Sequence, residues 1–377
     1  MRNYAKKSTF ASFLPGIAGI KGIPIWCHYV NRGQAVASFG SKDKNGAIME
    51  FSPAHTAYQT VKRNGFRTFI KIDGTVYEPF GDEDIPHDMK VEMNTLSIRE
   101  ECEEDGLATE ITYYVLPEEG LGALVREVNI TNISKTDAYI EIVDGMPALI
   151  PYGISMDNLK NMVETAKAWM QEESTPRGNA YYRVRASLED SAAVREIKEG
   201  NFALCHESDG GLIYPVADPA AIFAYDNSFE RPVVFAEKGI KGIKECKERH
   251  ANLFPAAFFC KEADLKPGDT ISLYEVYGFA ESMDRVDEYA SLHHGADYFA
   301  QKKARARELT DNLTMPIFTH TADARFDEYC RYTFMDNCLR GGAPIRLGNN
   351  KVFYVYSRKH GDTERDYNFF SVLPEYY

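Results

Sequence analysis

The sequence lacks several features that would assign it to a protein class at once. Its apolar runs stay far short of the ~20 residues that span a bilayer, so no membrane partner is expected. Basic residues are in deficit, with 43 Lys and Arg against 56 Asp and Glu and a net charge of −13. Nucleic acids and anionic membranes attract positive surfaces, so this balance also argues against a nucleic-acid partner.

Cysteine is scarce and scattered. The chain has seven cysteines and no CxxC pair, and they stand at positions 27, 102, 205, 246, 260, 330 and 338. This pattern fits neither a disulfide framework nor a zinc ribbon, and it indicates free thiols in a reducing, cytoplasmic setting. The mildly apolar stretch Phe10–Ile20 is broken by Pro15 and by glycines, so a cleaved secretory signal is not expected either. No metal and no cofactor is predicted.

The composition that is present belongs to a folded, soluble chain. Hydrophobic residues make up 44% and charged residues 26% of the 377 residues, which at about 150 residues per domain predicts two to three units. Aromatic residues are mostly Tyr and Phe, 23 and 22 of them, with two Trp. Such residues suit strands and sugar-stacking surfaces alike, so they do not decide between the two.

The chain up to about residue 280 alternates like strands. Phe66–Ile72 and Thr75–Phe80 flank Asp73-Gly74, which predicts a hairpin with a type I′ turn. Further short strands are predicted at Glu110–Leu116, Leu124–Thr131, Ala138–Val143, Tyr182–Leu188, Phe202–His206 and Ile271–Phe279. Many short strands without alternating helices predict a mainly β fold, an antiparallel β-sandwich.

Helical periodicity is confined to three places. One helix is predicted over Leu159–Met170, with Ser155 or Asp157 as its N-cap, packed on or beside the sheet. A second runs from Val286 to about Leu309 with a weak point at Gly295, and a third covers about Asp323–Leu339. These patterns predict a β-sandwich over residues 1–282, a helical linker over 283–342 and a terminal segment over 343–377.

Two groups of charged or titratable residues in the linker are interpreted as having no functional role. Its basic run is interpreted as a solvated helix face in preference to a phosphate site; the run consists of Lys302, Lys303, Arg305 and Arg307. His293 and His294 are adjacent, so they cannot face the same side of a helix, and no HExxH surrounds them.

Common catalytic motifs do not occur. The sequence has no GxSxG, Walker A loop or GxGxxG after a strand. The acidic run over residues 99–106 is interpreted as an exposed turn, because a catalytic pair needs two carboxylates in different environments. Asp82, Asp84, His87 and Asp88 have hard-ligand chemistry but lack the Gly and terminal Glu of an EF-hand loop.

One stretch, Ser357–Asn368, concentrates donors and acids beside aromatic residues. The candidates for substrate binding in it are Arg358, Lys359, His360, Asp362, Glu364, Arg365 and Asp366. Charged side chains bind sugar hydroxyls in fixed directions, and Arg and Lys can also hold phosphate. The alternative is an ion-paired connector that seats one domain on another.

Motifs along the whole chain resemble the N-terminal region of large bacterial β-glucan phosphorylases. They are Gly16–Trp26, Tyr29–Gln34, Ser38–Gly40, Ile48–Phe51, Pro53–Gln59, Gly65–Lys71, Val128–Asn132, Asp144–Gly153, Lys266–Asp269, Tyr356–Asp362 and Arg365–Asn368. These enzymes are the cellobiose-phosphorylase-like proteins of glycoside hydrolase families 94 and 161, which include β-1,2- and β-1,3-oligoglucan phosphorylases.

The resemblance implies a super-β-sandwich, a helical linker and then an (α/α)6 barrel that holds the active site. Twelve helices at about 12 residues each do not fit into the residues after the sandwich, so the chain is expected to be the sandwich and linker part of such an enzyme. The catalytic acid, an Asp, is expected beyond Tyr377. The partners implied are a β-linked oligoglucan, inorganic phosphate as co-substrate, the missing barrel and a second copy in a homodimer.

Two other functions stay open. The chain could work alone as a non-catalytic carbohydrate-binding or assembly module. It could also be a self-contained glycosidase, which requires two carboxylates across a cleft within these residues.

Overall fold

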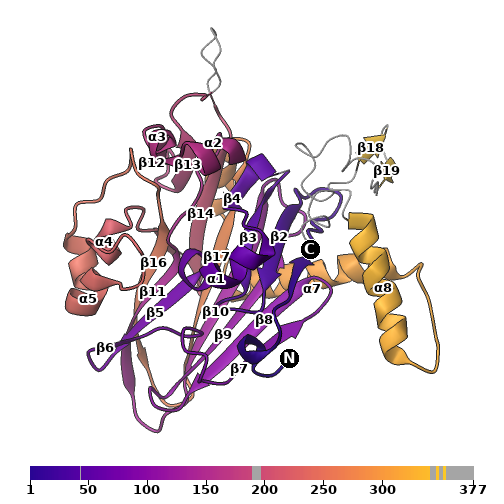
Figure 1. Ribbon diagram of the computed structural model, residues 1–377, viewed down its shortest axis with the longest axis horizontal. Coiled ribbons are helices and arrows are strands. Elements are labelled where there is room, and N and C mark those ends of the chain that lie inside the picture. The colour runs from indigo at the N-terminus through magenta and orange to yellow at the C-terminus, as the bar shows by residue number, and fades with distance from the viewer. Residues whose placement is uncertain (43, 189–196, 340–344, 348–350, 354–377) are drawn as a thin grey trace.

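A computed structural model describes residues 1–42, 44–188, 197–339, 345–347 and 351–353 (Figure 1). Every pair of named strands in it is antiparallel. The predicted mainly β, sandwich-like fold is therefore confirmed. None of the described helices is long and apolar enough to cross a membrane.

The largest element is a nine-stranded sheet, called the large sheet below. Eight strands follow the order β12-β13-β14-β17-β10-β9-β8-β7, and β15 pairs with β14. Their bounds are β7 His87–Val91, β8 Thr95–Cys102, β9 Leu107–Val115, β10 Gly122–Asn132, β12 Met170–Ser174, β13 Ala180–Val184, β14 Gly200–Glu207, β15 Leu212–Ile213 and β17 Thr270–Ala280.

Two four-stranded sheets pack against one face of the large sheet. The first small sheet has the order β1-β2-β3-β4, with β1 Ala11–Leu14, β2 Ile25–Val30, β3 Val36–Ser41 and β4 Ala47–Met49. The second small sheet has the order β16-β11-β5-β6, with β5 Arg67–Ile72, β6 Thr75–Tyr77, β11 Ala138–Met146 and β16 Ala257–Leu265. One continuous apolar core joins all three sheets, and its members include Phe39, Ile70, Ile111, Ile142 and Tyr277.

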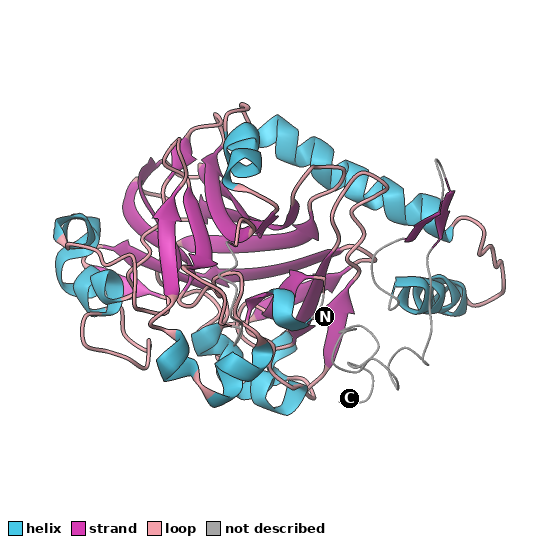
Figure 2. Cartoon of the chain, turned by 90° about the horizontal axis from the view of Figure 1, so that it is seen from above, coloured by secondary structure: helices cyan, strands magenta, loops and turns pink. Residues whose placement is uncertain are grey.

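Helices cover the outer faces of these sheets (Figure 2). Helices α6 (Met283–Ala290) and α7 (Ala296–Thr314) lie on the outer face of the large sheet, where Val286 and Phe299 join an apolar cluster with Phe202 and Val276. Helices α4 (Ala220–Phe223) and α5 (Val233–Glu245) cover the second small sheet, and α1 (Ala54–Asn64) covers the first.

The predicted hairpin is present with the predicted turn. Strands β5 and β6 pair with Ile72 opposite Thr75. Asp73 and Gly74 have φ values of 50° and 83°, and positive φ at both central positions is what a type I′ turn requires.

Two helix predictions were wrong in their extent. The helix predicted over Leu159–Met170 is instead two short helices, α2 (Met156–Asn161) and α3 (Val163–Ala166), after which Met170 begins β12 and pairs with Val184. Cross-strand pairing overrides the helical periodicity there, although Ser155 does cap α2 as predicted. The helix predicted from Val286 to Leu309 is interrupted between α6 and α7 by residues 291–295, which include the weak point predicted at Gly295.

The C-terminal part of the described chain is helical as far as Leu339. Helix α8 (Ala324–Leu339) matches its prediction and lies on the right of Figure 1, where the hydroxyl of Tyr332 donates to the carbonyl of Glu92 at 3.5 Å. Two short strands follow, β18 (Ile345–Leu347) and β19 (Lys351–Phe353). The proposed domain boundaries at 282 and 342 remain predictions.

Candidate functional site

The substrate-binding residues predicted from the sequence lie outside the described residues. They are Arg358, Lys359, His360, Asp362, Glu364, Arg365 and Asp366. Their role stays a prediction, and the described residues are considered for chemistry of their own below.

Ionisable groups meet inside the sandwich, in a group called the sheet-bridging cluster. It consists of Gln34, Thr68, Tyr113, Arg126, Asp144, Glu275 and Tyr277, all of them buried. Strand alternation explains its position, because Arg126 lies on the same face of β10 as Leu124 and Val128, which belong to the central core. Glu275 and Asp144 likewise take inward positions on β17 and β11.

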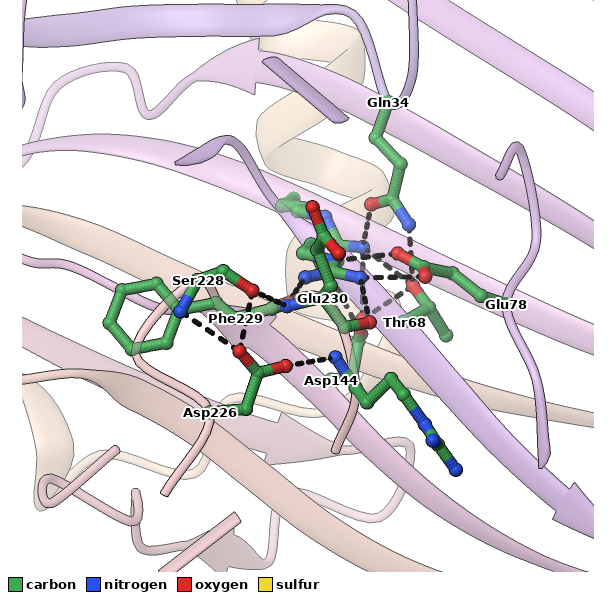
Figure 3. Close-up of polar contacts among 11 residues, drawn as sticks. Gln34, Thr68, Glu78, Asp144, Asp226, Ser228, Phe229 and Glu230 are labelled. Carbon is green, nitrogen blue, oxygen red and sulfur yellow. Dashed lines mark hydrogen bonds and ion pairs between the residues drawn. The ribbon is translucent and has the colours of Figure 1, made fainter. Parts of the chain in front are cut away.

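Arg126 joins the two layers directly. Its Nη1 donates to Oε2 of Glu275, the residue paired with it on β17, at 2.7 Å. The same Nη1 donates to Oδ2 of Asp144 in the second small sheet at 2.7 Å, and Nη2 donates to Oδ1 at 3.0 Å. Nη2 also donates to Gln34 Oε1 at 2.7 Å and to Thr68 Oγ1 at 3.1 Å. Figure 3 shows Gln34, Thr68 and Asp144 converging on this point.

The cluster has two carboxylates for one guanidinium. Burial acts to lower the pKa of Arg126, but the charges of Asp144 and Glu275 outweigh it, so this pKa is raised. Burial, reinforced by the charge of Asp144, raises the pKa of Glu275 well above its usual value. The raised pKa favours the protonated form of Glu275, and in that form the cluster holds one Arg126–Asp144 ion pair. With all members buried, the cluster can fix sheet register and stacking but cannot meet a substrate.

A second polar group lies on the outer side of β5. Arg67 binds Glu78 through two bonds, Nε to Oε1 at 2.6 Å and Nη2 to Oε2 at 2.7 Å, and it also donates to the carbonyl of Phe229. Asp226 organises the same loop by accepting the backbone N–H of Ser228 at 2.9 Å (Figure 3). This group anchors the loop before α5, so it too is structural.

The acidic region holds an open hollow of about 590 Å³. It is lined by Asp84, Ile85, Pro86, Asp88, Arg99, Glu101, Cys102, Glu103 and Glu104. Residues 99–102 belong to β8, so the prediction that the whole run is a turn was wrong for its first half. His87 is turned inward and bonds to buried Glu100 at 3.1 Å, away from the neighbouring acids. The acidic side chains of this hollow share one solvent-exposed environment, unlike a glycosidase pair.

A second hollow of about 370 Å³ lies where β15 meets β16 and α5. It is lined by Glu207, Leu212, Ile213, Tyr214, Ile240, Lys244, Cys260, Lys261 and Glu262. Tyr214 is more than half exposed, and Lys261 pairs with Glu207 across the hollow. An exposed aromatic ring beside paired charges is the chemistry that sugar hydroxyls and C–H patches recognise.

Helix α7 pairs its basic run with acidic residues of the sandwich. The predicted solvated face is confirmed for Arg307, which is exposed, whereas Lys302, Lys303 and Arg305 are partly buried. The pairs are Lys302–Glu119 at 2.6 Å, Lys303–Glu127 at 2.7 Å, Arg305–Glu118 at 3.0 Å and Arg307–Glu92 at 2.7 Å. Their acidic partners lie on or next to the strands of the large sheet, and sequence periodicity gives no information about such distant partners.

The other linker side chains expose apolar surface. Phe318 is 83% exposed, Met315 72%, Tyr329 66% and Phe326 51%. These four residues, called the linker apolar face below, lie on and between the ends of α7 and α8. Exposed apolar side chains grouped along one segment are typical of an interaction surface.

In the described residues, no group of three or more His, Cys, Asp or Glu side chains could hold a metal ion.

The charged cluster that was not predicted from the sequence is Arg126 with Asp144 and Glu275. The strand pattern of the sequence indicated this cluster, because a charged residue at an inward strand position, such as Arg126, must have a buried partner.

The matches between this chain and known proteins are with solved structures. No protein-family model and no curated protein matches the chain. Among solved structures, the chain is similar to a polysaccharide lyase, at 12% identity over 71% of this chain and 34% of that one, with a TM-score of 0.36. It is also similar to a bacterial glucoamylase complexed with acarbose, at 8% identity over 87% of this chain and 40% of that one, with a TM-score of 0.36. A kojibiose phosphorylase candidate from the human microbiome matches at 8% identity over 89% of this chain and 32% of that one, with a TM-score of 0.27.

The chain thus spans about a third to two fifths of the length of the first two structures.

Proposed function

We propose that the chain is the sandwich and linker part of an inverting β-glucan phosphorylase. In the complete enzyme, an Asp of a helical barrel protonates the glycosidic oxygen while inorganic phosphate attacks the anomeric carbon from the opposite face. The products are α-glucose 1-phosphate and an oligoglucan shortened by one unit. Phosphate takes the place of the water and its base, so a single catalytic carboxylate suffices.

The linker apolar face is the observation that carries the proposal. The antiparallel sandwich is followed by a segment that presents Phe318, between α7 and α8, and Phe326 and Tyr329, on α8, to solvent. A partner domain of matching apolar character would cover these side chains. The motif resemblance supplies the nature of that domain, a helical barrel. The described ionisable clusters are either buried or uniformly exposed, which fits a scaffold whose chemistry belongs to another domain.

Co-purification with the barrel tests this proposal. The reading frame downstream of codon 377 is expected to encode a helical domain, and this domain is expected to co-purify with the chain when both are expressed. Exchange protection of amides in α8 should rise in the complex and amides of β10 should be unchanged. A downstream helical domain that leaves α8 exchanging as in the free chain would contradict the proposal.

A second function is favoured by the hollow at Tyr214, namely binding of an oligoglucan without catalysis. Calorimetry with β-1,2-, β-1,3- and β-1,4-oligoglucans is the direct measurement. Tyr214→Ala should abolish any binding seen, whereas Tyr225→Ala, which removes a more exposed tyrosine outside this hollow, should leave it unchanged. Equal losses in both variants, or binding that survives Tyr214→Ala, would remove this candidate.

A further inference from the structure

Two buried histidines meet where the linker helices rest on the large sheet. His206 ends the outward row of β14 and is 0% exposed, and His294 lies between α6 and α7 and is 3% exposed. Their ring centroids are 5.4 Å apart with the planes at 70°. His294 also lies between two tyrosine rings, with Tyr298 at 3.9 Å and Tyr289 at 4.3 Å.

The two imidazoles have few hydrogen-bonding contacts. Both ring nitrogens of His206 lack a hydrogen-bond partner among the described residues, and the main chain of Tyr289 is the one hydrogen-bonding contact of His294. Buried polar groups are nearly always paired, so two such rings side by side need an explanation. Arg126 in the sheet-bridging cluster, by contrast, donates to both Asp144 and Glu275.

The surroundings favour the neutral imidazole. Burial, followed by the nearby His294 and His293, lowers the pKa of His206 to about 3. Burial also lowers the pKa of His294, an effect that the carboxylate of Glu119 and the main chain of Tyr289 oppose.

The other titratable or charged groups around the pair are few. Lys302 on α7 also disfavours a charged His294, and it pairs with Glu119. The remaining groups that face the pair are the hydroxyls of Tyr274, Tyr289 and Tyr298. Glu119 is the acid whose charge raises the pKa of His294, and it is already bonded to Lys302 and to Tyr298.

The pair sits at the joint between the sandwich and the linker. Ala296 donates its backbone N–H to the carbonyl of Ser208 at 3.0 Å, directly after β14. Phe299 stacks on Tyr274 of the large sheet at 4.6 Å. A charge introduced at His206 or His294 therefore appears inside the contact that docks α6 and α7.

We propose that His206 and His294 form an acid-sensitive latch, whose protonation releases α6 and α7 from the outer face of the large sheet. A docked imidazole cannot accept a proton without burying an unpaired charge, whereas an undocked one is hydrated. Acidification therefore shifts the equilibrium toward the undocked linker. The latch does not depend on the proposed phosphorylase role.

The direction in which pH changes the undocking equilibrium follows from proton linkage. An undocked imidazole binds a proton below pH ~6.5. In the docked state the pKa of His206 is lowered to about 3, and the pKa of His294 is also lowered. The undocking constant should therefore rise by up to about 10-fold per pH unit through His206, with a further rise from His294.

Hydrogen exchange of the whole chain tests the latch. Amides of α6 and α7 should lose protection between pH 7 and pH 5 after correction for intrinsic exchange rates, whereas amides of β10 and β17 should keep theirs. His206→Leu should be much less sensitive to pH over the same helices. His250→Gln, which removes an imidazole with 58% side-chain exposure, should respond like the wild type.

Three results would overturn the latch. They are equal pH dependence in the wild type and His206→Leu, unchanged protection of the wild-type helices at pH 5, and equal loss of protection in β10 and β17. Should the leucine variant not fold, His294→Gln removes the other titrating ring and is judged by the same comparison.

Discussion

Arg126 on β10 and Asp144 on β11 join the two layers of the sandwich through a two-pronged ion pair of 2.7 and 3.0 Å, with both side chains fully buried. Cross-strand pairing supplies the rest of the cluster, since Glu275 stands opposite Arg126 and Thr68 opposite Asp144. Register within each sheet and stacking between the sheets thus depend on the same guanidinium.

The two carboxylates of this cluster should respond differently to removal of their charge. Asp144→Asn should destabilise the chain by about 3–5 kcal/mol, because it leaves the Arg126 guanidinium buried without a paired charge. Glu275→Gln should not destabilise the chain at pH 7, because Gln keeps a neutral hydrogen-bonding side chain without the cost of holding a carboxyl group whose pKa is raised by burial. Urea unfolding at pH 7 measures both. Equal destabilisation by the two substitutions would contradict a raised pKa of Glu275.

Glu275 also predicts a pH dependence of stability. Its pKa is raised in the folded chain relative to the ordinary value of 4.5, so the folded state binds the proton more tightly than the unfolded state. The free energy of unfolding of the wild type should therefore fall, relative to that of Glu275→Gln, by up to about 1.4 kcal/mol per pH unit above pH ~4.5. Unfolding curves of both proteins at pH 5 and pH 8 measure this difference. An equal change in the free energy of unfolding of both proteins between pH 5 and pH 8 would contradict a raised pKa of Glu275.

The β5–β6 turn offers a test of backbone strain alone. Gly74 has a φ of 83°, and no atom lies within 4 Å of the position that a Cβ would take there, so Gly74→Ala should cost about 1 kcal/mol through conformation only. Gly120 has equally open surroundings without a positive φ, which makes Gly120→Ala the matched control. Thermal unfolding should separate the two variants, and equal midpoints would exclude strain at the turn.

The linker apolar face should make the isolated chain self-associate. Phe326→Gln combined with Tyr329→Gln should lower the apparent mass in sedimentation experiments, because it removes exposed apolar area from α8 while keeping good helix formers at both positions. Tyr225→Gln removes a tyrosine that is 81% exposed elsewhere and should have no effect. A wild-type chain that stays monomeric at high concentration would show that this face needs no cover.

Local rules predicted those parts of the fold that local residues determine. Asp73-Gly74 specifies its turn through backbone conformation, and Ser155 caps α2 through its own side chain. The break after Ala166 depended on pairing between Met170 and Val184, which local periodicity does not contain.

The clusters were predictable only in part. The inward position of Arg126 could have been deduced from its strand neighbours, but its partner Glu275 lies 149 residues further along the chain. Likewise, the adjacent His293 and His294 were expected to face different sides, and they do, one exposed and one buried. That His294 meets His206 required the docking of α7 on the large sheet.

Phosphate release from α-glucose 1-phosphate and an oligoglucan acceptor tests the central claim most directly. The purified chain alone should release no inorganic phosphate, and the complex with the downstream helical domain should release it continuously. Turnover by the 377 residues alone would contradict the claim that they are a scaffold whose chemistry resides in another domain.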